Sequence, residues 1–389
     1  MAGALLAPAS SWALFDDHVE FWAAYNVTDD TNVLRLSKNL NPAAIAAVPP
    51  KKDDTISTAH LGVSLNVPIS QQNVQAEYTW FQSKYRYYKD LDNTGHTARV
   101  HLGWLVQQVF TGTLGYNESQ GLASFNNIQR NLPDLVTSRS AYWTGNWMVT
   151  PRYRASAALT AGETEHSAVE RSLNNIRIES GELGLSYVTP LDNSAGVVAR
   201  FEHGRLPHET LLAGLPFDNE YRQYGAGATV TWIPTGLSRF DGRAEWVRRT
   251  YDQNTQRNYR GPILRALYTW APSGKLTIAA SLSRDVGPAD DVQTSFVLVT
   301  GGYVRPRWAV SDKVTVQANA EYNVWDYHGD FVTGQTYRNR VRTFGASIAY
   351  RPTRKVLLQA GWNRETRASD LLTGDYEVDV AFIEGRVGF

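Results

Sequence analysis

A repeat of about 40 residues runs through most of this 389-residue chain, and it limits the fold more than any other feature. Six segments reach a turn that contains proline, most of them just after an aromatic residue, and two further segments follow the pattern without proline. The eight turns fall at Pro68, Gln107, Pro151, Pro190, Pro234, Pro272, Ser311 and Pro352. A period of this length is typical of a propeller blade of four short strands or of a pair of long strands.

Strand length decides between these two alternatives. Between the turns, residues alternate with period two over stretches of about 10 residues, for example in 224–232 and 314–322. Blade strands are usually shorter, whereas about 10 residues in a tilted strand span a bilayer. Each repeat is therefore predicted to be a hairpin of two transmembrane strands.

The connections between the predicted strands alternate in length. Tight turns alternate with longer polar segments, which cover roughly 28–54, 89–95, 119–138, 165–175, 205–219, 251–258, 286–291, 327–336 and 367–375. Short periplasmic turns and longer outer loops are typical of bacterial outer-membrane barrels. The sequence predicts an all-β fold, a transmembrane up-and-down antiparallel β-barrel of about 18 strands in the bacterial outer membrane, with both termini periplasmic. Sixteen strands are also compatible, because a long loop isolates the first strand near 19–27.

Composition and motifs narrow the function. The chain carries 38 Lys and Arg and 38 Asp and Glu, and this balance argues against a nucleic-acid binder. It has no cysteine, which excludes disulfides and thiolate chemistry. No nucleophile elbow, phosphate-binding loop or zinc-protease motif occurs. We therefore expect no enzyme, with no catalytic residue, no cofactor and no metal ion.

The first 13 residues differ from the rest of the chain. A short apolar stretch leads to small residues at Ser11 and Ala13, spaced as before a signal-peptidase cleavage point, although no basic region precedes it. We interpret 1–13 as a residual signal peptide and 14–389 as a single outer-membrane β-barrel domain.

Aromatic residues recur at one register relative to the tight turns. Such rings lie at the headgroup level of a membrane, with the apolar body in lipid and the polar tip in water. The predicted girdle at the membrane interface consists of Trp104, Trp147, Tyr187, Trp232, Trp270, Trp308, Tyr350 and Phe389. Phe389 also ends an alternating strand, and a terminal Phe of this kind resembles the signal that the outer-membrane assembly machinery reads.

Successive side chains of a strand point to opposite faces, so residues at odd-numbered distances from a girdle residue of the same strand are predicted to face the lumen. We call these two alternating sets of positions the two parities of a strand. Positions that share the parity of the girdle are apolar, as in 276–282, whereas the other parity is charged and polar. The predicted lumen-facing residues, which are candidate solute contacts, are Glu77, Arg99, His101, Arg154, Arg200, Glu202, Asp241, Arg243, Glu245, Arg265, Arg305, Arg307, Glu321 and Arg386. His203 is interpreted in the same way. These charges either pair along the wall and stiffen it, or they form a hydrogen-bonding lining for a hydroxyl-rich solute.

Several segments resemble one known family. They are Asp30–Leu36, Arg139–Trp143, Tyr187–Ser194, Tyr259–Gly261 with Tyr268–Lys275, and Arg284–Gly287. Over most of 14–389, and in the same order, the chain resembles EpsL-type outer-membrane proteins of exopolysaccharide operons. The resemblance implies a porin-type barrel connected with secreted polysaccharide. It supplies no catalytic or ligand residues.

Three functions are compatible with these observations. The barrel passes exopolysaccharide through the outer membrane or assists its passage, or it is a general or oligosaccharide-specific diffusion porin, or it is a closed barrel that recruits periplasmic secretion components. The expected partners are outer-membrane lipid, a polysaccharide or oligosaccharide solute, periplasmic secretion components and the assembly machinery. Nucleic acid is not among them.

Overall fold

The computed structural model describes residues 18–38, 51–207, 210–212, 215–217, 220–252, 258–288, 296–328 and 336–389. The strands in these ranges are β1 (Val19–Asp30), β2 (Asp54–Ile69), β3 (Gln72–Tyr85), β4 (Asn93–Val106), β5 (Phe110–Leu122), β6 (Leu135–Thr150), β7 (Tyr153–His166), β8 (Ile176–Val188), β9 (Ser194–Arg205), β10 (Thr210–Leu212), β11 (Leu215–Phe217), β12 (Tyr221–Thr235), β13 (Ser238–Tyr251), β14 (Tyr259–Ser273), β15 (Leu276–Pro288), β16 (Phe296–Ala309), β17 (Val314–His328), β18 (Tyr337–Tyr350), β19 (Val356–Ser369) and β20 (Tyr376–Gly388). Two short 3-10 helices, η3 (Lys89–Leu91) and η4 (Val169–Asn174), lie in connections between strands.

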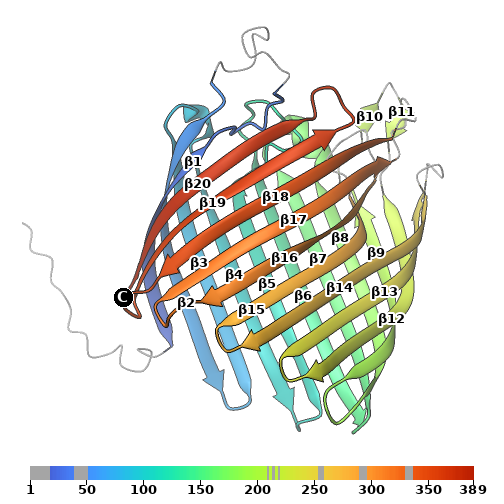
Figure 1. Cartoon of the computed structure of the whole chain (residues 1–389). Coiled ribbons are helices and arrows are strands. Elements are labelled where there is room, and N and C mark those ends of the chain that lie inside the picture. The colour runs from blue at the N-terminus through green and yellow to red at the C-terminus, as the bar shows by residue number, and fades with distance from the viewer. Residues whose placement is uncertain are drawn as a thin grey trace, which may run out of the picture.

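Eighteen of these strands form one closed antiparallel barrel (Figure 1). Successive strands pair with each other, and β1 pairs with β20 to close the sheet. The strands β10 and β11 form a separate small hairpin, so that β9 pairs directly with β12. At the closing seam, Trp22 of β1 lies opposite Gly388 of β20.

The predicted fold class and the count of 18 strands are confirmed, and the alternative of 16 strands is wrong. Some strands run further than predicted. Because β5 ends at Leu122 and β6 begins at Leu135, the connection predicted at 119–138 is shortened to 123–134. The predicted signal peptide at 1–13 and parts of the longer predicted loops lie outside the described residues.

Several tight turns use a left-handed backbone at residues other than glycine. Between β4 and β5, Gln107 and Gln108 have φ values of 51° and 59°, and Ser70 between β2 and β3 has 57°. Two consecutive positive φ values are typical of hairpin turns whose twist matches that of the flanking strands. The local steric cost is therefore offset by pairing of the long strands on either side.

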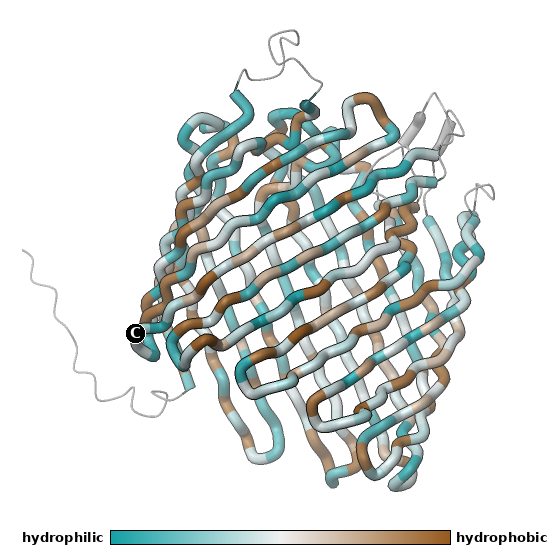
Figure 2. The backbone as a smooth tube through the Cα atoms, in the orientation of Figure 1, coloured by the Kyte–Doolittle hydropathy of each residue, from teal (hydrophilic) through white to brown (hydrophobic). Residues whose placement is uncertain are grey.

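Side chains alternate between the two faces of the wall, and hydrophilic and hydrophobic residues are interleaved along the strands in Figure 2. In β12, every second residue from Arg222 to Trp232 is exposed, whereas those between them are partly or fully buried. Within the described ranges, no helix is long and apolar enough to cross a membrane.

Buried apolar side chains gather at the loop end of the barrel. Leu34, Leu91 and Phe125, from the connections after β1, β3 and β5, belong to one buried cluster. In the same connections, the backbone N–H of Tyr88 donates to the Asp54 carboxylate at 2.9 Å. Burial raises the pKa of the Tyr88 phenol to about 12, so this hydroxyl stays protonated and donates to the Lys51 carbonyl. The loops after β1, β3 and β5 are thus one packed unit.

Candidate functional site: the charged interior of the barrel

One ion pair identifies the inner face of the wall. The Arg243 guanidinium on β13 donates to both carboxylate oxygens of Glu182 on β8, at 3.0 and 2.6 Å. Two strands, β9 and β12, lie between them. Neighbouring strands are about 4.8 Å apart, so the two backbones are separated by about 14 Å. Side chains can bridge this separation only where they converge, which is on the concave side. Arg243 and Glu182 therefore face the interior.

The strand register extends this assignment to the other predicted lumen residues. Directly opposed residues in an antiparallel pair share a face. Arg265 lies opposite Arg243, and the ladders β14–β15 and β15–β16 carry the same face on to Arg305 and Arg307. Most of these side chains are paired with a carboxylate. Besides Arg243–Glu182, the pairs that include predicted residues on these strands are Arg200–Glu202, Arg249–Glu202, Arg239–Asp241, Arg243–Glu245, Arg265–Asp285 and Arg305–Glu321.

Other predicted lumen residues have no carboxylate partner. In the described part of the chain, no carboxylate oxygen lies within 4 Å of the guanidinium groups of Arg99, Arg154 and Arg307, although Glu77 is directly opposite Arg99 in the ladder. His101 Nδ1 lies 3.0 Å from the Tyr142 hydroxyl.

At the seam, the Arg386 guanidinium stacks 4.0 Å above the ring of Trp22, with the nearest Glu20 oxygen also at 4.0 Å. The predicted lumen set thus contains paired arginines, stacked ones and uncompensated ones.

The interpretation of His203 as a lumen residue is wrong. Its neighbour Glu202 accepts hydrogen bonds from Tyr221 and Arg249 on the inner face. His203 follows Glu202 directly and therefore points outward, where its Nε2 lies 2.5 Å from Glu220. The single-residue shift in parity moves this side chain to the opposite face of the wall.

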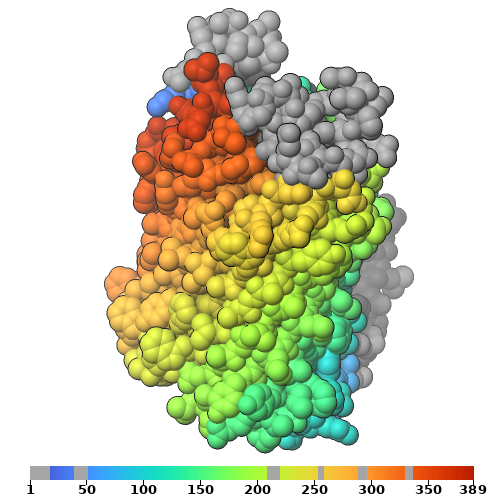
Figure 3. Space-filling model, turned by 90° about the vertical axis from the view of Figure 1, so that its right-hand side faces the viewer, coloured from blue at the N-terminus to red at the C-terminus, as the bar shows by residue number. Residues whose placement is uncertain are grey.

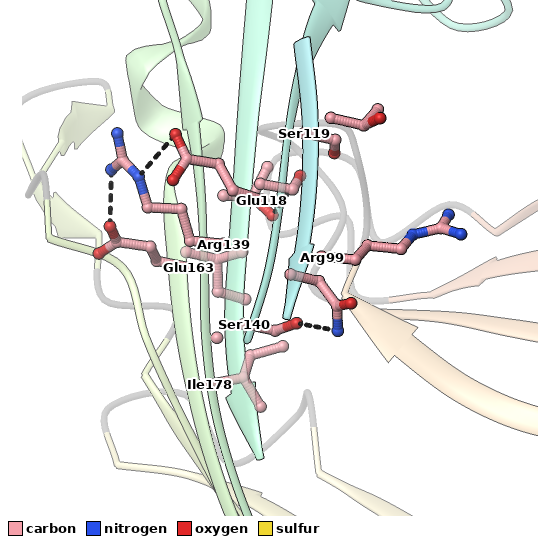
Figure 4. A pocket seen from close by; sticks show the side chains of 13 residues that line it. Arg99, Glu118, Ser119, Arg139, Ser140, Glu163 and Ile178 are labelled. Carbon is pink, nitrogen blue, oxygen red and sulfur yellow. Dashed lines mark hydrogen bonds and ion pairs between the residues drawn. The ribbon is translucent and has the colours of Figure 1, made fainter. Parts of the chain in front are cut away.

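A polar hollow of about 550 Å³ lies against β4–β8 (Figure 4). Its inner lining consists mainly of hydroxyl and amide side chains, with one arginine: Thr97, Arg99, Asn117, Ser119, Ser138, Ser140 and Thr164. Figure 4 shows Arg99 and Ser119 on one side of the strands, and Arg139 and Glu163 on the other. Asn117 donates to the Ser140 hydroxyl at 3.4 Å, and the two lie directly opposite each other in the β5–β6 ladder. The hollow offers many hydrogen-bonding groups and one uncompensated positive charge.

The loop end of the β15–β16 hairpin folds into the interior. Pairing of β14 with β15 ends at Leu264 and Arg284, and beyond this point β15 leaves the wall. The buried Arg249 on β13 donates to the carbonyls of Val286 and Gly287 at 3.2 and 3.4 Å, across the position of β14. Side chains of the hairpin pack against those of the inner wall in one buried cluster: Tyr221, Val247, Tyr251 and Ile263 with Val286, Phe296 and Leu298.

A second segment narrows the barrel from the opposite direction. The connection 123–134 between β5 and β6 reaches β19, where the Arg367 guanidinium donates to the Asn126 carbonyl and, at 3.3 Å, to Asn127 Oδ1. Five strands separate β5 from β19 around the wall. Gln129 of the same connection donates to the Arg35 carbonyl at 2.7 Å. The loop therefore lies across the mouth of the lumen rather than outside it.

The predicted girdle lies on the outer face of the wall. Trp232 is 56% exposed and Phe389 is 69% exposed, and most of the other rings are also exposed: Trp147, Tyr187, Trp270, Trp308 and Tyr350. Trp104 is partly covered, because its ring lies over Gly112, where a Cβ would have no room. Phe110 stacks on Trp147 with 5.6 Å between ring centroids. These rings follow the tight-turn end of the barrel.

Several residues that shape the interior were not predicted from the sequence. Arg249 and Arg367 hold the two inward segments, and Asp285 is the partner of the predicted Arg265. A signal for the hairpin existed, since Phe296–Val299 is a continuous apolar run where a membrane strand should alternate. Among the described residues, no group of three or more His, Asp or Glu side chains has the arrangement of a metal site.

Comparison with known proteins agrees with this geometry. Residues 225–389 match the model of the family described as Putative beta-barrel porin 2. The outer membrane protein opdK of Pseudomonas aeruginosa is similar in structure, with a TM-score of 0.50 and 9% sequence identity, over 96% of this chain and 99% of that chain. OccK2 (OpdF) of the same organism matches with a TM-score of 0.50 and 10% identity, over 96% and 98%. No curated protein sequence matches the chain.

The chain has the fold of an 18-stranded outer-membrane β-barrel, and its C-terminal part matches a porin family. The family match covers the barrel from within β12 to its last strand, and the structural similarity extends the same 18-stranded architecture to the remaining strands. At identities near 10%, the solved structures establish the fold and nothing about the solute.

Proposed function

We propose that this barrel passes hydroxyl-rich solutes of the saccharide class across the outer membrane. The hollow against β4–β8 carries the proposal, because saccharides are recognised by many hydrogen-bonding groups held on a rigid wall. Among the described residues, no carboxylate oxygen lies within 4 Å of the Arg99 guanidinium, and guanidinium groups form bidentate pairs with carboxylates. The favoured solute is therefore a saccharide that carries carboxylate groups.

The link to exopolysaccharide is a narrower part of the same proposal. It rests on the segments that resemble EpsL-type proteins, including Asp30–Leu36 and Tyr187–Ser194. In this role the barrel provides the outer-membrane passage and periplasmic secretion components deliver the polymer. Both termini are then periplasmic, on the same side as the tight turns.

A closed barrel that serves as a docking site is the second candidate. The inward hairpin held by Arg249 and the loop held by Arg367 favour it, because both take up space in the lumen. A barrel narrowed in this way passes solute only where these segments leave room or move aside. Conductance distinguishes the two candidates directly.

The test is permeation through the purified chain in planar bilayers and in liposomes. We expect stable conductance steps, and faster liposome swelling in oligosaccharides that contain uronic acid than in neutral ones of equal size. Arg99→Gln should remove most of this preference. Arg154→Gln is the matched control, because it removes another unpaired inner arginine outside the hollow.

Three results decide the outcome. Absence of conductance in the wild-type chain would refute the channel and favour the docking barrel. Equal loss of preference in the two variants would remove the hollow as a solute site. If deletion of the gene leaves the amount of surface polysaccharide unchanged, the proposed role in exopolysaccharide passage is refuted.

A further inference from the structure

On the outer wall of β13–β18, four arginines near the loop end have no acidic partner among the described residues. Arg248 and Arg260 are exposed and lie directly opposite each other in the ladder, so two like charges face one another. Arg284 and Arg342 follow on β15 and β18 with the same outward parity. No carboxylate oxygen of the described residues lies within 4 Å of these four guanidinium groups. Facing like charges destabilise a sheet unless something compensates them.

The outer face of β5–β9 shows that this arrangement is not general. On the outer face of β5–β8, Arg139 donates to Glu163 at 2.9 Å and lies 3.7 Å from Glu118. Arg177 lies 3.1 Å from Glu163, and Arg205 on β9 lies 3.9 Å from Glu179. Arginines at the loop end of that wall are thus neutralised within the chain. On β13–β18, by contrast, Arg338 and Arg340 are paired with Asp326 and Asp370, whereas Arg248, Arg260, Arg284 and Arg342 are not paired with a carboxylate within the described residues.

The unpaired arginines lie at the level of the outer headgroups. Eight residues separate Arg342 from the girdle residue Tyr350, and ten separate Arg260 from Trp270. A strand rises about 3.3 Å per residue and tilts by about 40° in such barrels, which gives a height of about 20–25 Å above the girdle. The apolar band of an outer-membrane barrel is about 25 Å tall. The girdle lies at one edge of this apolar band, and the arginines lie at the other edge.

A large apolar groove lies directly beneath them, in the wall of β12–β17 that faces the viewer in Figure 3. The groove has a volume of about 1460 Å³, and Arg284 and Arg342 form part of its lining. Its outward side chains are mostly apolar, and large and small ones are mixed: Trp246, Leu264, Leu282, Tyr322 and Phe344 lie among Ala266, Ala280, Gly302 and Ala320. Arg248 and Arg260 come two residues after Trp246 and two before Pro262, which also line the groove.

One donor at this site is still unsatisfied. Arg284 Nη1 donates to the Thr300 hydroxyl at 3.2 Å, but Arg284 Nε is buried without a hydrogen-bond partner. A buried donor of this kind is costly unless an acceptor reaches it. The acceptor that suits several guanidinium groups at once is a phosphate, through bidentate hydrogen bonds.

We propose that this outer wall binds a phosphorylated lipid of the outer leaflet. Its phosphate groups lie on Arg248, Arg260 and Arg284, and its acyl chains fill the groove below. A lipid is the occupant that the site requires, because the anionic contacts and the apolar groove adjoin along the bilayer normal. The inference is independent of the solute proposed for the lumen, since the site lies on the other face of the wall.

The test uses the full chain in phosphatidylcholine nanodiscs, with bisphosphorylated lipid A as probe and the same lipid without phosphate as comparison. Lipid occupancy is measured by native mass spectrometry. We expect the wild-type chain to prefer the phosphorylated probe, and the triple variant Arg248→Gln, Arg260→Gln and Arg284→Gln to bind it at least about tenfold more weakly. The control Arg177→Gln with Arg205→Gln, on the outer face of β8 and β9, should bind normally.

Heat-modifiable migration on gels checks that each variant is folded. Equal binding of the two probes by the wild-type chain would overturn the proposal, as would undiminished binding by a folded triple variant. If the groove is instead covered by a second copy of the chain, the wild type will migrate as a dimer that Leu282→Arg dissociates, and this result would also overturn it. If the triple variant does not fold, Ala280→Leu should weaken binding by filling the groove, and unchanged binding by that folded variant would refute the acyl site.

Discussion

Replacing Arg249 by methionine should destabilise the barrel more than any single substitution in the exposed lumen. The side chain is fully buried, and its guanidinium joins β9, β12 and β13 to the inward hairpin. It donates to Gln223 Oε1 at 2.9 Å, to Glu202 at 3.3 Å and to the Val286 carbonyl at 3.2 Å. It also stacks 3.9 Å above the Tyr221 ring. Methionine preserves much of the volume but none of these polar contacts.

The magnitude follows from these contacts. Hydrogen bonds to a charged group contribute about 1.5–3 kcal/mol each, and removal of one member of a buried ion pair costs about 3–5 kcal/mol. Glu202 keeps its contacts with Arg200 and Tyr221, and the variant no longer desolvates a guanidinium. The net loss of unfolding free energy should therefore be about 3 kcal/mol. The hairpin around Val286 should also detach from the wall.

Denaturant unfolding in lipid vesicles, followed by tryptophan fluorescence, measures the first effect, and conductance noise measures the second. Arg239→Met is the control. Its side chain is 55% exposed and pairs with Asp241, so its loss should cost less than about 1 kcal/mol. If Arg249→Met and the control both unfold at the same denaturant concentration as the wild type, the buried contacts of Arg249 do not stabilise the barrel. That result would refute the prediction.

Four further results are expected. Arg367→Ala should raise single-channel conductance, since it releases the loop that crosses the mouth, and unchanged conductance would show that the loop is held by other contacts. Arg305→Glu with Arg307→Glu should shift ion selectivity toward cations in planar bilayers with normal folding yield, because both side chains are inside and a wet lumen limits the energy of each ion pair to about 1 kcal/mol. Trp232→Ala should lower stability in vesicles modestly and leave permeation intact, whereas a large change in transport alone would place this ring in the lumen. Protease added to intact cells should cut within 31–53, and protection there with cleavage at the tight turns would invert the topology.

The faces of the strands could be predicted from the sequence because the pleat is a local property. Asp241, Arg243 and Glu245 have one parity, and the structure places them on the inner face as a consequence of alternation alone. Their partners could not be predicted. The contact of Arg243 with Glu182 depends on the order of four strands and on the curvature of the wall, and neither is encoded in the alternation pattern.

The inward segments were missed for a related reason. Periodicity identifies where a strand can lie in the membrane, but it does not say whether the end of the strand stays in the wall. The continuous apolar run at Phe296–Val299 indicated burial on both faces, which a lipid-exposed strand does not need. For the loop 123–134 the sequence holds no comparable signal, since Asn126 and Asn127 contact Arg367 mainly through geometry that the whole barrel creates.

The seam between β1 and β20 sets the order in which the barrel can form. All other ladders in the wall join consecutive strands of the sheet, so hairpins can form one after another, but Trp22 meets Gly388 only when nearly the whole chain is in place. Loop-closure entropy grows with the logarithm of chain length, so this contact costs about 4 kcal/mol more than closing a tight turn of a few residues. A circular permutant could join β20 to β1 by a short linker and open the chain at the turn after Ile69. In this permutant the extra closure cost would fall on the β2–β3 ladder instead of the seam. The same barrel should result, with the last step of its assembly moved by two strands.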